Sequence, residues 1–307
     1  MNKWISRIGI TAVAFAAAAC GSSSTGGAGG AAATAAGAGG AEATSTGGVG
    51  GDPSSTATGV LATGSTGSGA VQPPAQKLYG KAIHNLTFEI DYAPGAEPYT
   101  GAVLGFGEVW DVSQTNVERL FQGSNKVFDI PRTLDKMEKL TDVTGADFTV
   151  DQILAIASKH RNQLSSGDTA TFYFVWLDGY YRDAAGVNKN VLGVSLGTTG
   201  VLAMFKPVIA GTGSGSPGLN VERYVEQATI VHELGHAAGL VNNGLAQAAP
   251  HDDAAHEGHC TNQDCVMYWA IEGTAGAISY VQKSLLSSST ILYGKECLDD
   301  AAKATAP

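Results

Sequence analysis

Two histidines and one glutamate stand close together in the segment VHELGHAAGLVNNG, residues 231–244. On an α-helix, residues four positions apart differ by only about 40° in direction, so His232 and His236 would project from the same face. Two neutral imidazoles at this spacing can bind one zinc ion, and Glu233 beside them can take a proton from a water that attacks a carbonyl. The pattern therefore predicts a helix that carries the centre of a zinc-dependent hydrolase.

A catalytic zinc ion is commonly held by three protein ligands, so a third ligand is needed. Five of the seven histidines lie within residues 232–259, and those that follow the helix are His251, His256 and His259. Each of these three is a candidate for the third ligand. Two aspartates follow His251, so residues 251–253 could instead hold a calcium ion or face solvent.

The stretch HELGHAAG resembles the metzincins, zinc peptidases defined by the pattern H-E-x-x-H-x-x-G-x-x-H and a later methionine turn. In that family the glycine, here Gly239, lets the chain turn sharply after the helix. Asn242 stands where the third histidine of the pattern belongs, and asparagine is a weak zinc ligand, so Asn242 is either a rival ligand or a lost one. Met267, in the segment CVMY, is the candidate for the methionine that forms a hydrophobic base beneath the ligands; core packing alone is the alternative.

Residues 259–267 form the pattern H-C-x4-C-x-M, which is similar to archaemetzincins, where the third zinc-binding histidine directly precedes the first cysteine. This resemblance covers residues 231–267. It implies that His259 is the third ligand and that a longer loop separates His259 from Gly239. Asn242 would then be an ordinary turn residue.

The chain contains four cysteines, Cys20, Cys260, Cys265 and Cys297. Archaemetzincins bind a second, structural zinc ion with four cysteines, two of which follow the methionine turn, whereas here only Cys297 follows it. We therefore expect no second, cysteine-bound zinc ion. If Cys20 carries a lipid, an oxidising compartment would instead join two of the other three cysteines in a disulfide, and the sequence leaves the pair open.

The first residues predict export. Residues 1–19 have a basic start, a short apolar run and small residues at the end, as a secretory signal does. Residues 17–21, AAACG, resemble a bacterial lipobox that would place a lipid on Cys20; an ordinary signal peptide cut nearby is the alternative. Residues 20–75 are rich in Gly, Ala, Ser and Thr, which favours a flexible tether, and residues 76–307 would form the folded domain.

The charge pattern excludes one class of partner. The formal net charge is −10, and no cluster of lysines and arginines occurs, so we expect no nucleic-acid partner. We expect a monomer that is exported, is attached to a membrane at the cell surface or in the periplasm or is released outside, and acts on peptides or proteins.

The elements that must position these residues predict an α+β fold with a mixed sheet in one core. Strands are expected at 84–92, 169–177, 191–196 and 201–209. Helices are expected at 114–122, 134–140, 150–163, 221–238 and 290–301. The strand at 169–177 is continuously apolar and should be central, and the last two strands should pair antiparallel. The strand at 201–209 is either an edge strand that borders a substrate cleft or an internal strand.

Together these features predict a metzincin-like zinc endopeptidase. A mixed-sheet subdomain would carry the helix with His232, and an irregular C-terminal subdomain would carry the methionine turn. The alternative from another class is a surface binding or adhesion lipoprotein that keeps the peptidase fold without turnover. Asn242 favours that alternative, whereas Glu233 speaks against it, because a purely structural zinc site needs no carboxylate there.

Overall fold

The computed structural model describes residues 72–103, 107–215, 220–287 and 290–306, all within one of the two compact units of the chain, Asp52–Pro307. The expectations for residues 1–19, for Cys20 and for most of the tether fall outside these described residues. Within the described part, none of the helices combines the length and the apolar character needed to cross a bilayer.

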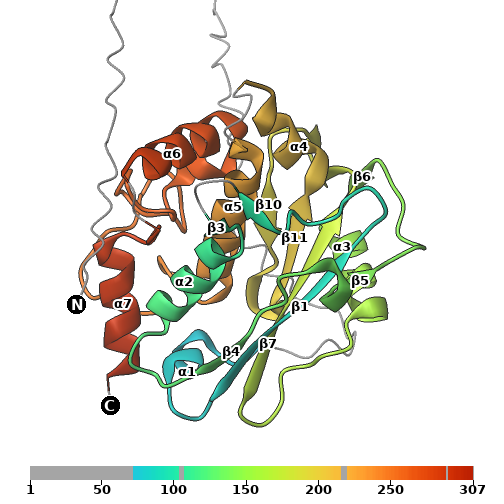
Figure 1. Ribbon diagram of the computed structural model, residues 1–307. Coiled ribbons are helices and arrows are strands. Elements are labelled where there is room, and N and C mark those ends of the chain that lie inside the picture. The colour runs from blue at the N-terminus through green and yellow to red at the C-terminus, as the bar shows by residue number, and fades with distance from the viewer. Residues whose placement is uncertain (1–71, 104–106, 216–219, 288–289, 307) are drawn as a thin grey trace, which may run out of the picture. The chain divides into compact units, whose positions relative to one another are not determined.

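The core of the fold is a mixed sheet in the strand order β10-β11-β7-β1-β4, with β5 pairing the end of β1 (Figure 1). These strands are β1 (Asn85–Tyr92), β4 (Val127–Asp129), β5 (Glu138–Lys139), β7 (Thr169–Leu177), β10 (Gly193–Ser195) and β11 (Val201–Phe205). All pairs are parallel except β10 with β11. The α+β fold class and the mixed sheet expected from the sequence are confirmed.

The central position of β7 follows from its composition. Its residues after Thr169 are all buried, because the strand lies between β1 and β11 and carries aromatic side chains on its faces. Phe174 packs against Phe88 of β1 and against Trp176, with ring centroids 4.9 and 6.0 Å apart. A strand buried on both faces reads as a continuous apolar run rather than an alternating one.

The helices and short strands surround this sheet. The helices are α1 (Ala75–Tyr79), α2 (Asp111–Leu120), α3 (Val150–His160), α4 (Lys206–Gly211), α5 (Val221–Ala237), α6 (Thr274–Ser287) and α7 (Lys295–Thr305). Single 3₁₀ turns are η1 (Leu134–Lys136), η2 (Gly197–Thr199), η3 (Thr212–Gly215) and η4 (Trp269–Glu272). Separate ribbons are formed by β2 (Ala102–Val103) with β3 (Gly107–Glu108), and by β6 (Asp147–Phe148), β8 (Tyr180–Asp183) and β9 (Gly186–Asn188). In Figure 1, α2, α5, α6 and α7 lie on the left of the sheet and α3 on its right.

Strand β11 corrects one alternative. It is internal, hydrogen-bonded to β7 on one side and to β10 on the other, and all five of its residues are buried. The strand also ends at Phe205 rather than at 209, because Pro207 sits in the first turn of α4 and has no amide hydrogen for a sheet. The strand at this edge of the sheet is therefore β10, and β4 lies at the other edge.

Helix boundaries were predicted with mixed success. Helix α3 begins with a capping box, in which Thr149 and Gln152 exchange bonds of 2.8 and 3.3 Å. The helix expected at 134–140 is only the 3₁₀ turn η1 followed by β5, and α6 was not predicted. Asn220 precedes α5, where its backbone is left-handed (φ 49°) and its side chain makes no capping bond.

Helix α5 is tied to its surroundings by buried polar contacts. The Lys206 ammonium donates to Glu226 at 2.6 Å, and the backbone amide of Tyr99 donates to the same carboxylate at 2.7 Å. Ser113 of α2 donates to Gln227 at 2.6 Å. Because a buried carboxylate is costly unless it is paired, these bonds fix the rotation of α5 against α2 and α4.

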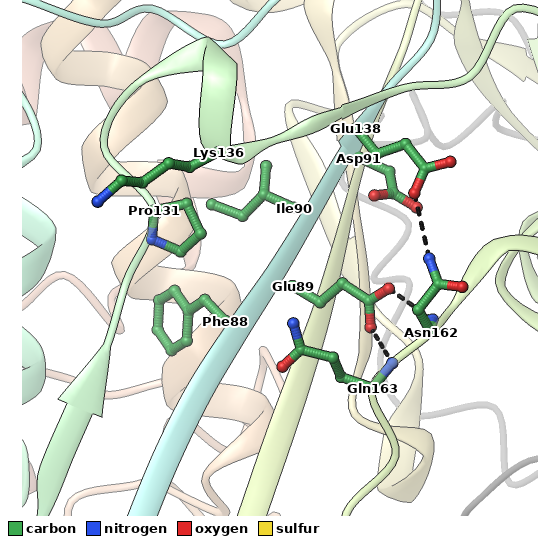
Figure 2. A pocket seen from close by; sticks show the side chains of 9 residues that line it. All are labelled: Phe88, Glu89, Ile90, Asp91, Pro131, Lys136, Glu138, Asn162 and Gln163. Carbon is green, nitrogen blue, oxygen red and sulfur yellow. Dashed lines mark hydrogen bonds between the residues drawn. The ribbon is translucent and has the colours of Figure 1, made fainter.

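A pocket of about 140 Å³ lies over β1, away from the histidines (Figure 2). Its wall includes Glu89, whose carboxylate accepts from the backbone amides of Asn162 and Gln163 at 2.5 and 2.7 Å. Asp91 lies beside it and accepts from Tyr173 at 2.7 Å. Burial, with smaller contributions from the charges of Glu89 and Glu138, raises the pKa of Asp91 to about 7, and the bond from Tyr173 only partly opposes this.

We predict that Asp91→Asn stabilises the protein above neutral pH. The pKa of Asp91 is higher in the folded state, about 7, than the unfolded value of 3.8, so the wild type loses stability as the pH rises through that window. The variant lacks this loss, so its free energy of unfolding at pH 8 should exceed that of the wild type by on the order of 1–3 kcal/mol. This figure is discounted from about 4 kcal/mol for screening by solvent in the pocket, and at pH 4 the two proteins should be equally stable. Urea denaturation at both pH values measures the difference. The exposed Asp135→Asn serves as control, and an equal gain at both pH values would contradict the prediction.

Candidate metal centre

Helix α5 delivers the first two histidines to one point. His232 and His236 are one turn apart and project from the same face, with ring centroids 4.7 Å apart and Nε2 atoms 3.0 Å apart. Two nitrogens that bind one zinc ion at about 2.0–2.1 Å are separated by roughly 3.3 Å in tetrahedral geometry. The helix therefore sets this pair at the spacing of a shared cation.

The tautomer of His232 is set by a backbone carbonyl. Its Nδ1 lies 2.6 Å from the oxygen of Val266, so Nδ1 carries the proton and donates it. The Nε2 lone pair is thereby left free and turned toward His236. A carbonyl partner of this kind is the usual outer support of a metal-binding histidine.

Met267 lies directly beneath the helix. Its side chain is fully buried, and a Cβ built on Gly235 would stand 2.3 Å from the Met267 sulfur. The glycine between Leu234 and His236 thus lets the methionine turn approach α5 more closely than any other residue would allow. The carbonyl of Val266, next to Met267, is held by this packing at hydrogen-bonding distance from His232.

The chain turns away sharply after α5. Gly239 has φ of +91°, a conformation that favours glycine. A Cβ at this position would also stand 2.3 Å from the side chain of Ala75, so there is no room for a larger residue. Asn242 follows with φ of +65°, is exposed, and takes no part in the histidine cluster. Its neighbour Asn243 lies beside His236 instead, with Nδ2 3.2 Å from Nδ1.

His259 joins the pair from a distant part of the chain. Its ring centroid lies 5.4 Å from that of His232 and 5.0 Å from that of His236, and the residue is fully buried. Its Nδ1 lies 3.1 Å from the carbonyl oxygen of Glu257, and its Nε2 lies in the cluster. This buried Nε2 has no hydrogen-bond partner, as is expected of an atom that would bind a metal ion.

The cluster has a fourth member that the sequence analysis missed. Glu272, the last residue of η4, brings a carboxylate oxygen within 3.0 Å of His259 Nε2. One ligand atom from each of His232, His236, His259 and Glu272 lies within 4.8 Å of the others. No spacing rule links Glu272 to the helix motif, because Glu272 lies on a separate 3₁₀ turn that meets the histidines only in the folded protein.

The structure places the two rival histidines elsewhere. The His256 ring stacks on Trp269, with centroids 4.0 Å apart and an interplanar angle of 6°, and its Nδ1 lies 2.9 Å from Asp253. His251 faces away from the cluster and is nearly buried between Cys260 and Asp300. Asp252 is exposed and Asp253 is engaged by His256, so the geometry gives no support to calcium at 251–253.

The expected disulfide is absent among the described cysteines. Cys260, Cys265 and Cys297 are free, buried thiols, and the sulfurs of Cys265 and Cys297 are 3.5 Å apart. The expectation was wrong because it counted cysteines alone. The three thiols converge with a histidine from the long loop after Gly239, His251, rather than forming one pair and a spare.

This thiol cluster forms a second group of possible metal ligands. The ligand atoms of His251, Cys260 and Cys297 lie within 4.8 Å of one another, and Cys265 adjoins Cys297. The backbone amide of Gly294 donates to the Cys265 sulfur at 3.0 Å, but burial and the neighbouring Cys260 raise the pKa of the Cys265 thiol to about 12. Donation from the thiols of Cys265 and Cys297, by contrast, lowers the pKa of Cys260.

His251 is oriented in this cluster by a carboxylate. Its Nδ1 lies 3.3 Å from the Cys260 sulfur, and its Nε2 lies 2.8 Å from Asp300, which is fully buried on α7. A carboxylate behind a histidine fixes the ring and strengthens it as a ligand. Three sulfurs and one nitrogen are the donors of a closed, structural zinc site, so these residues fit the metal that the cysteine count seemed to exclude.

Glu233 lies between the histidine cluster and the edge strand. A Cβ on Gly193 of β10 would stand 3.0 Å from Cγ of Glu233, so the carboxyl group is packed against that strand. Burial raises the pKa of Glu233 well above its usual value; the charge of Glu272 adds to this, and a bond from the backbone of Ser195 opposes it. A cation among the histidines would restore the carboxylate, which general-base catalysis needs.

The histidines themselves are in the state that a metal requires. Burial, with the neighbouring charge of His259, lowers the pKa of His232 to about 4. Burial and the other two rings lower the pKa of His236 well below its usual value. Both rings are therefore neutral at pH 7, and together with the bare Nε2 of His259 the donor set fits one zinc ion.

Comparison with known proteins gives distant structural similarity only. No family model matches the chain, and no curated protein is similar to it in sequence. Among solved structures, an archaemetzincin from Methanopyrus kandleri is 13% identical with a TM-score of 0.41, over 72% of this chain and 95% of that one. A zinc-dependent peptidase from Methanocorpusculum labreanum is 12% identical with a TM-score of 0.39, over 70% of this chain and 99% of that one. Mirolysin in complex with a compound is 12% identical with a TM-score of 0.33, over 74% of this chain and 100% of that one. At such TM-scores these similarities carry no argument about function, which rests on the geometry of the histidine cluster.

We predict that Gly235→Ala destabilises the protein by about 1–3 kcal/mol, because the new methyl group would overlap the Met267 sulfur in a filled core. Urea denaturation measures the loss, and zinc content should fall with it. Gly211→Ala is the matched control, since Gly211 also lies in a helix but has no atom within 4 Å of the added carbon. Equal stability of the two variants would show that Met267 does not press on α5.

Proposed function

We propose that this protein is a zinc-dependent endopeptidase with His232, His236 and His259 as zinc ligands. The observation that carries the proposal is the convergence of three histidine rings beside the buried carboxyl group of Glu233. Two of the rings come from one helix, and the third, His259, comes from a loop 23 residues after His236. A solvated helix face with polar residues would not assemble such a buried set.

The chemistry follows from the positions of these side chains. Zinc supplies a Lewis acid that polarises a peptide carbonyl and makes a water easier to deprotonate. The three imidazoles would hold the cation, with His232 and His259 oriented by the carbonyl oxygens of Val266 and Glu257. Glu233 takes the proton from the attacking water and returns it to the leaving amine.

The substrate would be held by the edge of the sheet. Within the described residues β10 has no partner on its outer side, and it lies against the part of α5 that carries Glu233. An extended peptide added there would place its backbone beside the general base, with its carbonyl directed toward the histidines. This proposal moves the substrate strand from 201–209, as considered from the sequence, to Gly193–Ser195.

A second zinc ion, bound by the thiol cluster with His251, would serve the fold rather than the reaction. His259 and Cys260 are consecutive, so a metal at the sulfurs would hold the third histidine in place from one residue away. Closed sites with sulfur ligands have this structural role in general.

The alternative, a binding protein without turnover, has less support. The alternative was based on Asn242 in the place of a third histidine, but Asn242 is exposed and lies outside the cluster. The ring of His259 lies 5.4 Å from that of His232 and supports its assignment as the third donor. Export and a lipid at Cys20 remain part of the proposal, supported by the composition of residues 1–21. Mass spectrometry of the mature N-terminus tests that part, and an unmodified Cys20 would contradict it.

We predict that Glu233→Gln lowers peptide hydrolysis by roughly 10²–10⁴-fold while the protein keeps its zinc, because the amide cannot accept the proton. Hydrolysis of a quenched fluorescent peptide library and metal analysis of the same samples measure both quantities. Glu222→Gln, in the first turn of the same helix, is the control and should retain activity. Full activity of Glu233→Gln would leave the binding protein or another enzyme class as the better account.

We also predict two zinc ions per purified full-length chain. His259→Ala should lose the ion at the histidines, and His251→Ala should lose the ion at the thiols, because each removes one donor from a different cluster. His256→Ala and Asn242→Ala should each keep two ions. Metal analysis after dialysis decides the outcome, and loss of zinc in either of these last two variants would overturn the ligand assignment.

A further inference from the structure

The carboxylate of Glu272 lies where a fourth ligand of the histidine metal would lie. Its Oε1 stands 3.0 Å from Nε2 of His259, yet that nitrogen has no hydrogen-bond partner of ordinary geometry. An imidazole nitrogen and a carboxylate oxygen are both zinc donors, and at this distance the two atoms could share one cation. Glu272 also falls within the 4.8 Å limit that joins the three histidines, and it is the only anionic donor in that group.

The turn that carries Glu272 is held firmly. Trp269, at the start of η4, is stacked flat on His256. At the other side, Gly276 of α6 packs so closely on Ala270 that a Cβ would stand 1.9 Å from its carbonyl oxygen. The stacking and the close packing fix the backbone of η4, so the carboxylate reaches the histidines as a built feature of the fold.

The side chain of Glu272 is partly exposed to solvent. Glu272 retains 26% of its side-chain exposure, whereas His259 beside it has none, so the carboxylate can rotate toward solvent and the imidazole cannot. Four protein donors fill the tetrahedral coordination of zinc, and catalytic sites differ from structural ones by keeping one position open. A zinc ion held by three histidines and Glu272 would have no position for water or substrate.

We propose that Glu272 is a fourth protein ligand that closes the histidine metal site, and that the site opens for reaction when Glu272 rotates away. This inference rests on the proposed zinc site at His232, His236 and His259. It deepens the proposed function by giving the enzyme a resting, latent state within its own fold. His256, through Trp269, is then a positioning residue for the turn that delivers the closing carboxylate.

The test uses the full chain loaded with Co²⁺ and titrated with acetohydroxamate, a small chelator that needs an open coordination position. Glu272→Ala should bind acetohydroxamate at least tenfold more tightly than the wild type, which is the gain expected if the wild-type site is closed about 90% of the time. The variant should also hold the metal at the histidines at least tenfold more weakly, because a ligand is gone. Cobalt–thiolate absorption from the second cluster reports in each sample that the protein is folded.

Two further variants sharpen the result. Glu118→Ala, an exposed glutamate on α2, is the control and should match the wild type in both affinities. Glu272→Gln keeps the size of the side chain and removes its charge, and it should resemble Glu272→Ala in both affinities. If acetohydroxamate affinity and metal affinity are both unchanged in Glu272→Ala, the closing role is wrong. If hydrolysis falls while metal affinity stays, Glu272 acts on the substrate and the proposal is likewise overturned.

The outcomes separate this inference from the proposed function. Peptide hydrolysis should rise in Glu272→Ala if both are right. If no variant hydrolyses peptides but acetohydroxamate binding tightens as expected, the enzyme proposal fails and the closed site stands. If the wild type takes up no metal at the histidines, both fail.

Discussion

The hydrogen bond from His232 Nδ1 to the carbonyl oxygen of Val266 is the contact on which the rest of the site depends. It joins the helix that carries two histidines to the turn that carries the methionine, and it frees Nε2 for a cation. Two contacts position the turn for this 2.6 Å bond. Met267 packs closely on Gly235, and the Cys260 amide donates to the Met267 carbonyl. A buried hydrogen bond of this kind is costly to lose, because neither partner can turn to water.

The electrostatics of the site are balanced only with a cation present. Neutral imidazoles and two carboxyl groups lie close together in a largely buried site. Without a cation, burial raises the pKa of Glu233 and favours its protonated form. The same burial that lowers the pKa values of the histidines makes them good ligands at neutral pH. Metal binding and folding are therefore linked in this part of the chain.

Local patterns were enough to predict the sheet and the helix motif, since a continuous apolar run, a capping box and a four-residue histidine spacing are each set within one element. They were not enough for residues that meet only in the folded protein. Glu272, His251 and Asp300 lie on three separate segments after the helix, and no periodicity relates them. The cysteine count misled for the same reason, because a histidine from an unpatterned loop took the place of a missing cysteine.

The thiol cluster has a consequence for when the site can form. Cys297 and Asp300, which complete that cluster, lie on α7 and are synthesised after every residue of the histidine cluster. Until α7 has emerged and packed, Cys260 lacks its neighbour Cys297, and His251 lacks the carboxylate of Asp300. A chain still on the ribosome therefore carries the H-E-x-x-H helix before the thiol cluster is complete, so the order of synthesis sets the order in which the two clusters of ligands can form.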